Sequence, residues 1–111
     1  MTQRIDHLIN GKTVAGSDYF ETVNPATQGV LAEVASGTEA EVNAAVQAAK
    51  DAFPAWAGLP ATERAKKIRA LGELIAKHVP EIAQTETNDT GQVIAQTGTQ
   101  LIPRAADNFS Y

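Results

Sequence analysis

Residues 20–35 organise this chain and read Phe20-Glu21-Thr22-Val23-Asn24-Pro25-Ala26-Thr27-Gln28-Gly29-Val30-Leu31-Ala32-Glu33-Val34-Ala35. They form two short apolar arms around a turn, which predicts strands at residues 19–23 and 30–34. Pro25 fixes its own φ angle and pushes Asn24 toward an extended conformation, and the Asn24 side chain suits a turn. Gly29 is expected to take the positive φ that returns the chain.

A second turn signal lies upstream, within residues 5–14. The pair Asn10-Gly11 favours the positive φ angles of a two-residue hairpin turn, and apolar residues alternate loosely on both sides of it. The sequence therefore predicts a first hairpin here, followed by the two strands already described, in a small antiparallel sheet.

From residue 38 onward, apolar residues recur at the spacing of a helix. Thr38-Glu39-Ala40-Glu41 is typical of a capping box, in which the first and last residues each bond the backbone of the other. We expect this helix to end at Pro54, because proline lacks the N–H that a helix interior needs. A second helix is expected to begin at Pro60.

Two further helical segments complete the pattern. Pro80 is expected to begin a third helix, and Gly91 to end it. Residues 93–111 predict a last helix that is interrupted near Gly98 and restarts near Pro103. Its apolar stripe still runs at residue 111, so we interpret Tyr111 as a cut in a longer protein rather than a natural end.

Composition limits the function of the chain. Its 111 residues suit one small domain, and a formal net charge of −4 with a pI near 5.0 argues against nucleic acid or an anionic membrane as a partner. Cysteine is absent, which excludes disulfides, thiolate metal sites and a cysteine nucleophile within these residues. No signal peptide or membrane-spanning run is evident, so we expect a cytoplasmic protein.

The apolar content predicts a thin core. Hydrophobic residues make up 43% of the chain, but 20 residues are alanine, and Leu, Ile, Val and Phe together supply only 24. A small domain with so few large apolar side chains is expected to depend on contacts with more protein.

Asp89-Thr90-Gly91 matches the tripeptide of aspartic proteases. That chemistry needs an apolar strand before the aspartate and a second, facing carboxylate. Here Thr85-Glu86-Thr87-Asn88 precedes it in a helical segment, so we interpret the tripeptide as a helix end closed by Gly91.

No other residues form a complete catalytic apparatus. His7 and His78 have no matching carboxylate pattern and are expected to lie at the surface. The basic cluster of Lys66, Lys67 and Arg69 is flanked by acids, which indicates a solvated helix face. The chain has no nucleophile elbow and no glycine-rich phosphate loop.

Five segments together resemble the amino-terminal part of the aldehyde dehydrogenases, in order and in spacing. They are Leu8-Ile9-Asn10-Gly11-Lys12, Thr22-Val23-Asn24-Pro25-Ala26-Thr27, Ala48-Ala49-Lys50-Asp51-Ala52-Phe53 with Trp56, Glu63-Arg64, and Glu86-Thr87-Asn88-Asp89-Thr90-Gly91. Ala52-Phe53-Pro54-Ala55-Trp56 and Leu101-Ile102-Pro103-Arg104-Ala105 further resemble a member that acts on a semialdehyde of aromatic acid catabolism. Gln28 departs from the family pattern, which usually has glycine directly after the threonine.

The resemblance implies an α+β fragment, with N-terminal antiparallel hairpins followed by helices, of an α/β aldehyde dehydrogenase fold. Residues 1–111 would be the N-terminal portion of the NAD(P)-binding domain, before its Rossmann-like core. The whole enzyme, a homodimer or homotetramer, would oxidise a semialdehyde through a catalytic Cys, pass hydride to NAD(P) and use a Glu as base. Those residues are expected beyond Tyr111, so residues 1–111 would be inactive alone. The alternative is a stand-alone helical interaction module without activity.

The resemblance also implies two sites. Many family members hold a structural Na⁺ or K⁺ ion with oxygens that correspond to Thr22, Val23 and Asp89, although Asp89 equally suits bonds to amides at a helix end. Arg104 falls where many members line the aldehyde entrance with an apolar residue, which predicts that it binds a substrate carboxylate, with Asn108 as a helper. The alternative for Arg104 is an ordinary surface arginine, in contact with water or Asp107.

Overall fold

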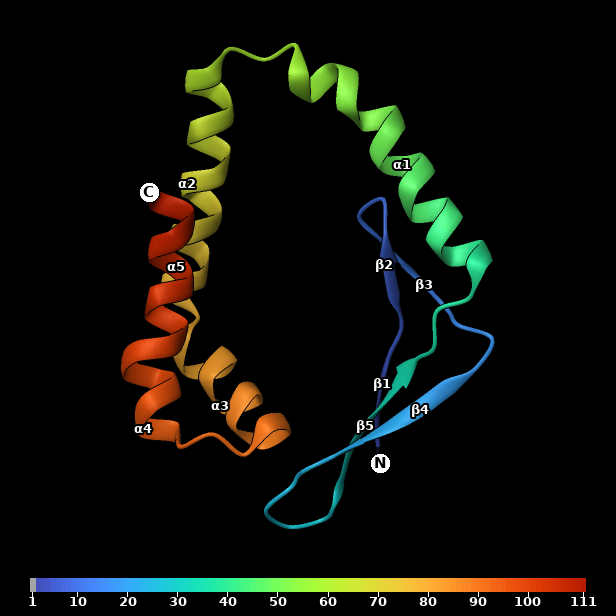
Figure 1. Ribbon diagram of the computed structural model, residues 1–111, viewed down its shortest axis with the longest axis vertical. Coiled ribbons are helices and arrows are strands. Elements are labelled where there is room, and N and C mark those ends of the chain that lie inside the picture. The colour runs from blue at the N-terminus through green and yellow to red at the C-terminus, as the bar shows by residue number, and fades with distance from the viewer. Residues whose placement is uncertain (1) are drawn as a thin grey trace. The chain divides into compact units, whose positions relative to one another are not determined.

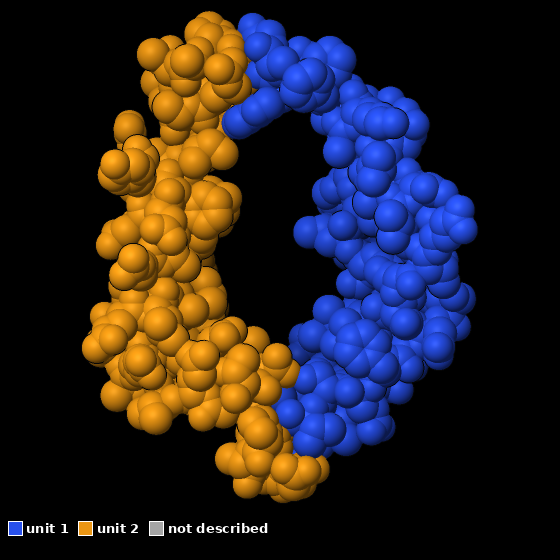
Figure 2. All heavy atoms as spheres, viewed as in Figure 1, with its two compact units in different colours: residues 1–23, 29–58 blue, residues 24–28, 59–111 orange. Residues whose placement is uncertain are grey.

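The computed structural model describes residues 2–111, and the chain divides into two compact units (Figure 2). The first unit comprises Met1–Val23 and Gly29–Gly58, and the second comprises Asn24–Gln28 and Leu59–Tyr111. Strands precede helices along the chain, as the sequence predicts. None of the helices within residues 2–111 has the length and apolar character needed to cross a bilayer.

Within residues 2–111, five short strands make up the sheets of the first unit (Figure 1). The hairpin pairs β2 (His7–Ile9) with β3 (Lys12–Val14), and a three-stranded sheet has the order β1 (Gln3–Ile5), β5 (Val30–Ala35), β4 (Tyr19–Val23). The predicted antiparallel pairing is found for β2 with β3 and for β4 with β5, whereas β1 pairs in parallel with β5. Only one residue separates β1 from β2, which is too short for those two strands to fold back on each other.

The two strand turns use positive φ at different kinds of residue. Asn10 (φ 54°) and Gly11 (φ 71°) form the predicted hairpin turn. In the second turn the positive φ of 62° lies at Gln28, so the expectation for Gly29 was wrong. Gln28 is held there because its N–H donates to the Asn24 carbonyl at 2.8 Å and its Nε2 donates to the Pro25 carbonyl at 3.0 Å.

A network around Tyr19 links three strands of the first unit with two of its connecting segments. The Tyr19 hydroxyl donates to Asp6 Oδ1 at 2.6 Å and accepts from the Gly16 N–H at 3.0 Å. The Arg4 guanidinium lies 4.4 Å from the centre of the Tyr19 ring and pairs with Glu33 at 3.3 Å. The hydrogen bond to Asp6 is the largest cause that raises the pKa of Tyr19 above its usual value.

Helix α1 (Glu39–Ala57) begins at the predicted capping box but does not end at Pro54. The helix continues one turn further, so Trp56 lies in it. Because Pro54 begins the final turn, its missing N–H leaves one helix bond unmade, while its carbonyl still accepts from the Gly58 N–H at 3.0 Å. None of the residues of α1 is buried, and Val42 and Phe53 on its apolar stripe are 58% and 64% exposed.

The second unit is helical. It contains α2 (Ala61–Lys77), α3 (Val79–Thr90) and a long helical segment made of α4 (Ile94–Gln96), the π-helical turn η1 (Thr97–Leu101) and α5 (Ile102–Ser110). Figure 1 shows α5 running alongside α2. The interruption that the sequence predicts between Gly98 and Pro103 is therefore a π turn inside a continuous helix.

The contact between α2 and α5 depends on Gly72, which is buried in the middle of α2. A Cβ atom at this position would lie 2.9 Å from both the Ala106 carbonyl and the Ser110 Oγ, and 3.2 Å from the Phe109 Cβ. These are closer than normal contacts, so only glycine allows the two helices to pack at this separation.

We expect Gly72→Ala to lower the free energy of unfolding of the full-length protein by about 1–2 kcal/mol. The overpacking cost of about 1–3 kcal/mol exceeds the gain of up to about 1 kcal/mol in helix propensity. Gly98→Ala is the matched control, since its Cβ would lie 3.9 Å from the Ala83 Cβ, an ordinary contact. Thermal or denaturant unfolding that shows equal stability for both variants would contradict this interpretation.

A second prediction concerns acid stability at the start of α1. Hydrogen bonds from the Thr38 hydroxyl and, at 2.9 Å, from the Thr38 N–H lower the pKa of Glu41 below its usual value of 4.5. A carboxyl group whose pKa is lower in the folded state stabilises the protein above its unfolded pKa, and this contribution is lost as the pH falls through the folded pKa.

Glu41→Gln should therefore flatten the fall in melting temperature of the full-length protein as the pH decreases from about 6 to about 3. Glu39→Gln removes a neighbouring carboxylate but keeps the capping box, and it should retain the wild-type pH dependence. If the melting temperatures of Glu41→Gln and the wild type fell in parallel with pH, the capping box would not contribute to acid stability.

Candidate functional site

Arg104 and Asn108 lie one turn apart on α5, as the sequence predicts, and both are exposed. The buried residues of α5 are Ile102 and Ala106. At about 100° per residue, the positions of Arg104 and Asn108 fall on the face of the helix opposite these two. Within residues 2–111 the Arg104 guanidinium has no hydrogen bond or ion pair, and Asp107 does not bind it.

This arrangement leaves a cation free to bind an anion from outside the described residues. A guanidinium presents a planar fork of donors that matches the two oxygens of a carboxylate. The amide of Asn108, four residues further along the helix, offers a neutral donor on the same face. The two residues together suit a carboxylate-bearing ligand.

Thr97 anchors the beginning of this helical segment, and the sequence analysis did not single it out. It is fully buried, its Oγ1 lies 2.8 Å from the Thr87 Oγ1 of α3, and it donates to the Ile94 carbonyl at 3.2 Å. The break in helical spacing around Gly98 and Pro103 was the available signal. Composition alone does not predict that a threonine is the buried residue.

Asp89 occupies the last turn of α3 and is exposed. Gly91 follows in the left-handed conformation with φ 80°, and its N–H donates to the Thr87 carbonyl at 2.9 Å. The interpretation of Asp89-Thr90-Gly91 as a helix end is confirmed. The strand that an aspartic protease motif requires is not found here.

The other two predicted cation ligands, Thr22 and Val23, are the last residues of β4 in the first unit. The turn that follows Val23 belongs to the second unit and packs on the end of α3. A Cβ at Gly91 would lie 2.9 Å from the Pro25 Cγ. Within the second unit, therefore, the segment that follows Val23 contacts the segment that follows Asp89.

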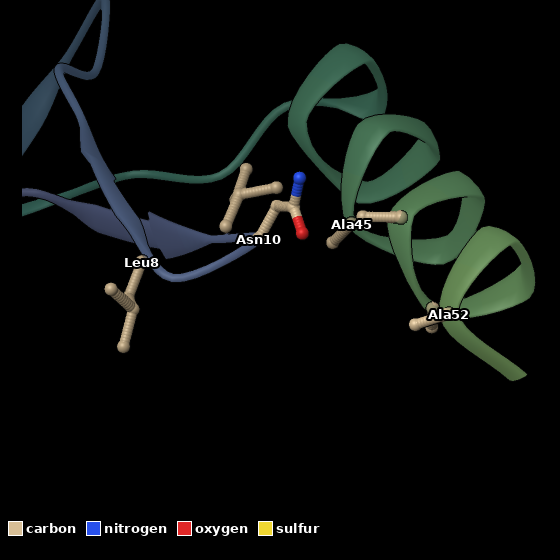
Figure 3. Close-up of a pocket in the computed structure, with 7 residues that line it drawn as sticks. Leu8, Asn10, Ala45 and Ala52 are labelled. Carbon is tan, nitrogen blue, oxygen red and sulfur yellow. The ribbon is translucent and has the colours of Figure 1, made fainter. Parts of the chain in front are cut away.

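The hollow drawn in Figure 3 lies between the β2–β3 hairpin and α1, and it has a volume of about 290 Å³. Ala45 and Ala52 project from α1 on the side of the hairpin, and Asn10 lies next to Ala45. Its lining is aliphatic apart from that asparagine: Leu8, Ile9, Ala45, Ala48, Ala49 and Ala52. A surface without charged groups or phosphate donors does not suit a nucleotide cofactor or catalysis.

The two histidines belong neither to the Arg104 site nor to the predicted cation site. His78 lies at the surface as expected, with 42% of its side chain exposed, whereas His7 is half-buried and its Nε2 is covered. His78 lies 3.3 Å from Glu81, one turn away. Within residues 2–111, no group of three or more His, Asp or Glu side chains is arranged to hold a metal ion.

Comparison with known proteins gives a consistent result. The model of the aldehyde dehydrogenase family matches residues 13–111. The chain is 61% identical to a 5-carboxymethyl-2-hydroxymuconate semialdehyde dehydrogenase of Escherichia coli over 98% of its length, and 35% identical to a 2-aminomuconic semialdehyde dehydrogenase of Bos taurus over 96%. The NAD⁺ complex of an aldehyde dehydrogenase from Bacillus cereus has a TM-score of 0.94, with 38% identity over 98% of the chain.

The matched region is a small part of each relative. The chain spans 23% of the E. coli enzyme, 22% of the bovine enzyme and 23% of the B. cereus enzyme. The resemblance that the sequence analysis drew from its motifs, including the one to a semialdehyde dehydrogenase of aromatic acid catabolism, is confirmed.

Proposed function

Since the chain belongs to the aldehyde dehydrogenase family, we propose that the full-length protein oxidises a carboxylate-bearing semialdehyde to its acid with NAD(P). The proposed substrate is 5-carboxymethyl-2-hydroxymuconate semialdehyde, after the relative that is 61% identical. The observation that carries this choice is Arg104, an exposed arginine without a partner among residues 2–111, on the outer face of α5.

The chemical step belongs to residues outside this chain. No cysteine is present to act as the nucleophile, and the sequence has no glycine-rich phosphate loop. The hollow of Figure 3 does not suit a nucleotide either. We assign residues 1–111 to the N-terminal portion of the NAD(P)-binding domain. When bound, NAD(P) supplies the hydride acceptor; the contribution of this chain is to bind and orient the substrate.

Three further assignments complete the proposal. The immediate partner of the chain is the remainder of its own protein, because the exposed apolar stripes of α1 and α2 need a covering surface. The enzyme is assigned to the cytoplasm as a homodimer or homotetramer. An acidic chain without a helix able to span a membrane, within the described residues, is compatible with that location.

Arg104 is proposed to receive a substrate carboxylate, with Asn108 as a neutral helper. A bidentate contact between guanidinium and carboxylate supplies both affinity and orientation, and it holds the aldehyde end of the substrate in a fixed direction. A neutral aldehyde has no group to occupy this contact. Selectivity for charged over neutral aldehydes is therefore the property that this residue should control.

In the full-length enzyme, NAD(P)H formation should be observed with the dicarboxylate semialdehyde, and Arg104→Leu should raise its KM about tenfold to a hundredfold. This corresponds to the roughly 1.5–3 kcal/mol of a charged hydrogen bond, and a neutral aldehyde should be little affected. Arg69 is an exposed arginine on α2, and Arg69→Leu is the matched control. It should leave the KM for both aldehydes unchanged. If Arg104→Leu raised the KM for both aldehydes equally, or for neither, the assignment would be refuted.

The cation site is a separate proposal. Main-chain oxygens of Thr22 and Val23 with the Asp89 carboxylate form a hard-oxygen set that suits Na⁺ or K⁺. The contact of Pro25 with Gly91 supports it, since each residue lies two positions beyond one of the proposed ligands. The role of the ion would be structural.

Added NaCl or KCl should raise the melting temperature of the full-length enzyme above that in choline chloride at equal ionic strength. An ion that binds only the folded state stabilises it by mass action. Asp89→Asn should abolish the difference between the salts, whereas Asp107→Asn, an exposed aspartate on α5, should retain it. An Asp89→Asn enzyme that still distinguishes Na⁺ or K⁺ from choline would exclude this site.

A further inference from the structure

The helical segment Ile94–Ser110 buries three residues, and their spacing is unequal. They are Thr97, Ile102 and Ala106, which are five and then four positions apart. In an α-helix, residues four apart lie nearly in line, whereas residues five apart are turned by about 140°. A uniform α-helix would therefore turn Thr97 away from the face that buries Ile102 and Ala106.

The π turn η1 removes this mismatch. The Ile102 N–H donates to the Thr97 carbonyl, which is the five-residue bond of a π-helix. That bond places Thr97 almost directly below Ile102. The extra residue of η1 thus lets a single helix face carry all three buried side chains.

The two ends of this face have different anchors within the second unit. Thr97 is held to α3 by its contact with Thr87 at 2.8 Å. Ala106 lies against α2, where its carbonyl borders the space next to Gly72. Because both anchors are occupied, the rotation of α5 about its own axis is set by the number of residues between them.

We propose that η1 is a positioning device for the substrate site: it sets the rotation of α5, and with it the direction in which Arg104 and Asn108 face. The inference rests on the proposed role of Arg104. If the segment were α-helical throughout and anchored at Thr97, Arg104 would be turned by about 100° from its present direction. Thr97 is then a positioning residue that acts through Arg104.

Pro103 favours the π turn at this place. Proline has no N–H to donate, and in a regular α-helix its ring would collide with the Thr99 carbonyl. A π turn leaves one carbonyl without a helical partner where it returns to α geometry, so a residue without an N–H is tolerated there. The Thr99 hydroxyl donates back to the Ala95 carbonyl at 2.5 Å, and a side-chain bond of this kind often bends a helix.

The test compares a deletion with an insertion in the full-length enzyme. Deleting Gln100, which is exposed, in a Pro103→Ala background leaves Thr97 and Ile102 four apart, and an ordinary α turn then keeps them on one face without the collision that Pro103 would cause. This variant should keep its melting temperature and a KM for the dicarboxylate semialdehyde within about twofold of the wild type. Inserting one alanine after Gln100 places Thr97 and Ile102 six apart, and the KM should rise at least about tenfold while kcat/KM for a neutral aldehyde changes less than about threefold.

A deletion and an insertion that behave alike, both neutral or both damaging, would overturn the proposal. Where the insertion variant does not fold, Thr97→Val takes its place, because it keeps the shape but loses the bond to Thr87. It should raise the KM for the charged substrate about threefold, and Thr97→Ser should restore it. An unchanged KM in Thr97→Val would also overturn the proposal.

A separate variant tests the proposed role of Arg104 itself. Arg104→Leu alone reports whether the arginine binds the carboxylate, whatever the helix register. If Arg104→Leu loses affinity but the deletion and insertion do not differ, the receptor stands and the positioning role of η1 fails. If Arg104→Leu has no effect, the proposed function fails, and melting temperatures alone then decide whether the extra residue sets the register.

Discussion

The close approach of α5 to α2 at Gly72 is the contact on which the second unit depends. With no Cβ on Gly72, the Ala106 carbonyl and the Ser110 side chain reach the surface of α2. Ile102 and Ala106 are buried along this side of α5, and Arg104 and Asn108 are consequently left on the opposite side. The close approach of the two helices at Gly72 therefore determines where the candidate binding residues lie.

The core of the chain is small in proportion to its apolar surface. The buried hydrophobic residues within the described part are Ala32, Ala35, Ala83, Ile102 and Ala106, and four of these are alanines. Large side chains such as Phe53 remain 64% exposed on helices whose stripes have a clear apolar side. Burial of this surface against further protein would supply the stabilisation that the alanine core lacks. The match to only 22–23% of each relative's length agrees with that physical expectation.

Hydrogen bonds and a cation–π contact supply part of the stabilisation that the small apolar core does not. In the first unit, Arg4 and Asp6, at the end of β1, are linked to Tyr19 of β4 through one hydrogen bond of 2.6 Å and one cation–π contact of 4.4 Å. In the second unit, the buried Thr97 joins η1 to α3 through a hydroxyl contact. Directional bonds of this kind fix rotation and register, which apolar contacts between alanines do not. The orientation of α5 is consequently set by a directional bond as well as by its two buried apolar residues.

The sequence by itself determined the features that arise from neighbouring residues. Asn10-Gly11 predicted the hairpin turn, Thr38 with Glu41 the capping box, and Gly91 a helix end, because each depends on local backbone preferences and short-range hydrogen bonds. The motifs likewise identified the family, and the helical spacing placed Arg104 and Asn108 on one face. Only the tertiary structure decided the positive φ at Gln28, the passage of α1 through Pro54, the parallel pairing of β1, and the π turn that buries Thr97 in line with Ile102. The pairing of β1 and the burial of Thr97 depend on contacts between separate elements, and the positive φ at Gln28 depends on hydrogen bonds to the Asn24 and Pro25 carbonyls. Pro54 is tolerated because it lies in the last turn of α1, where only one helix bond is lost.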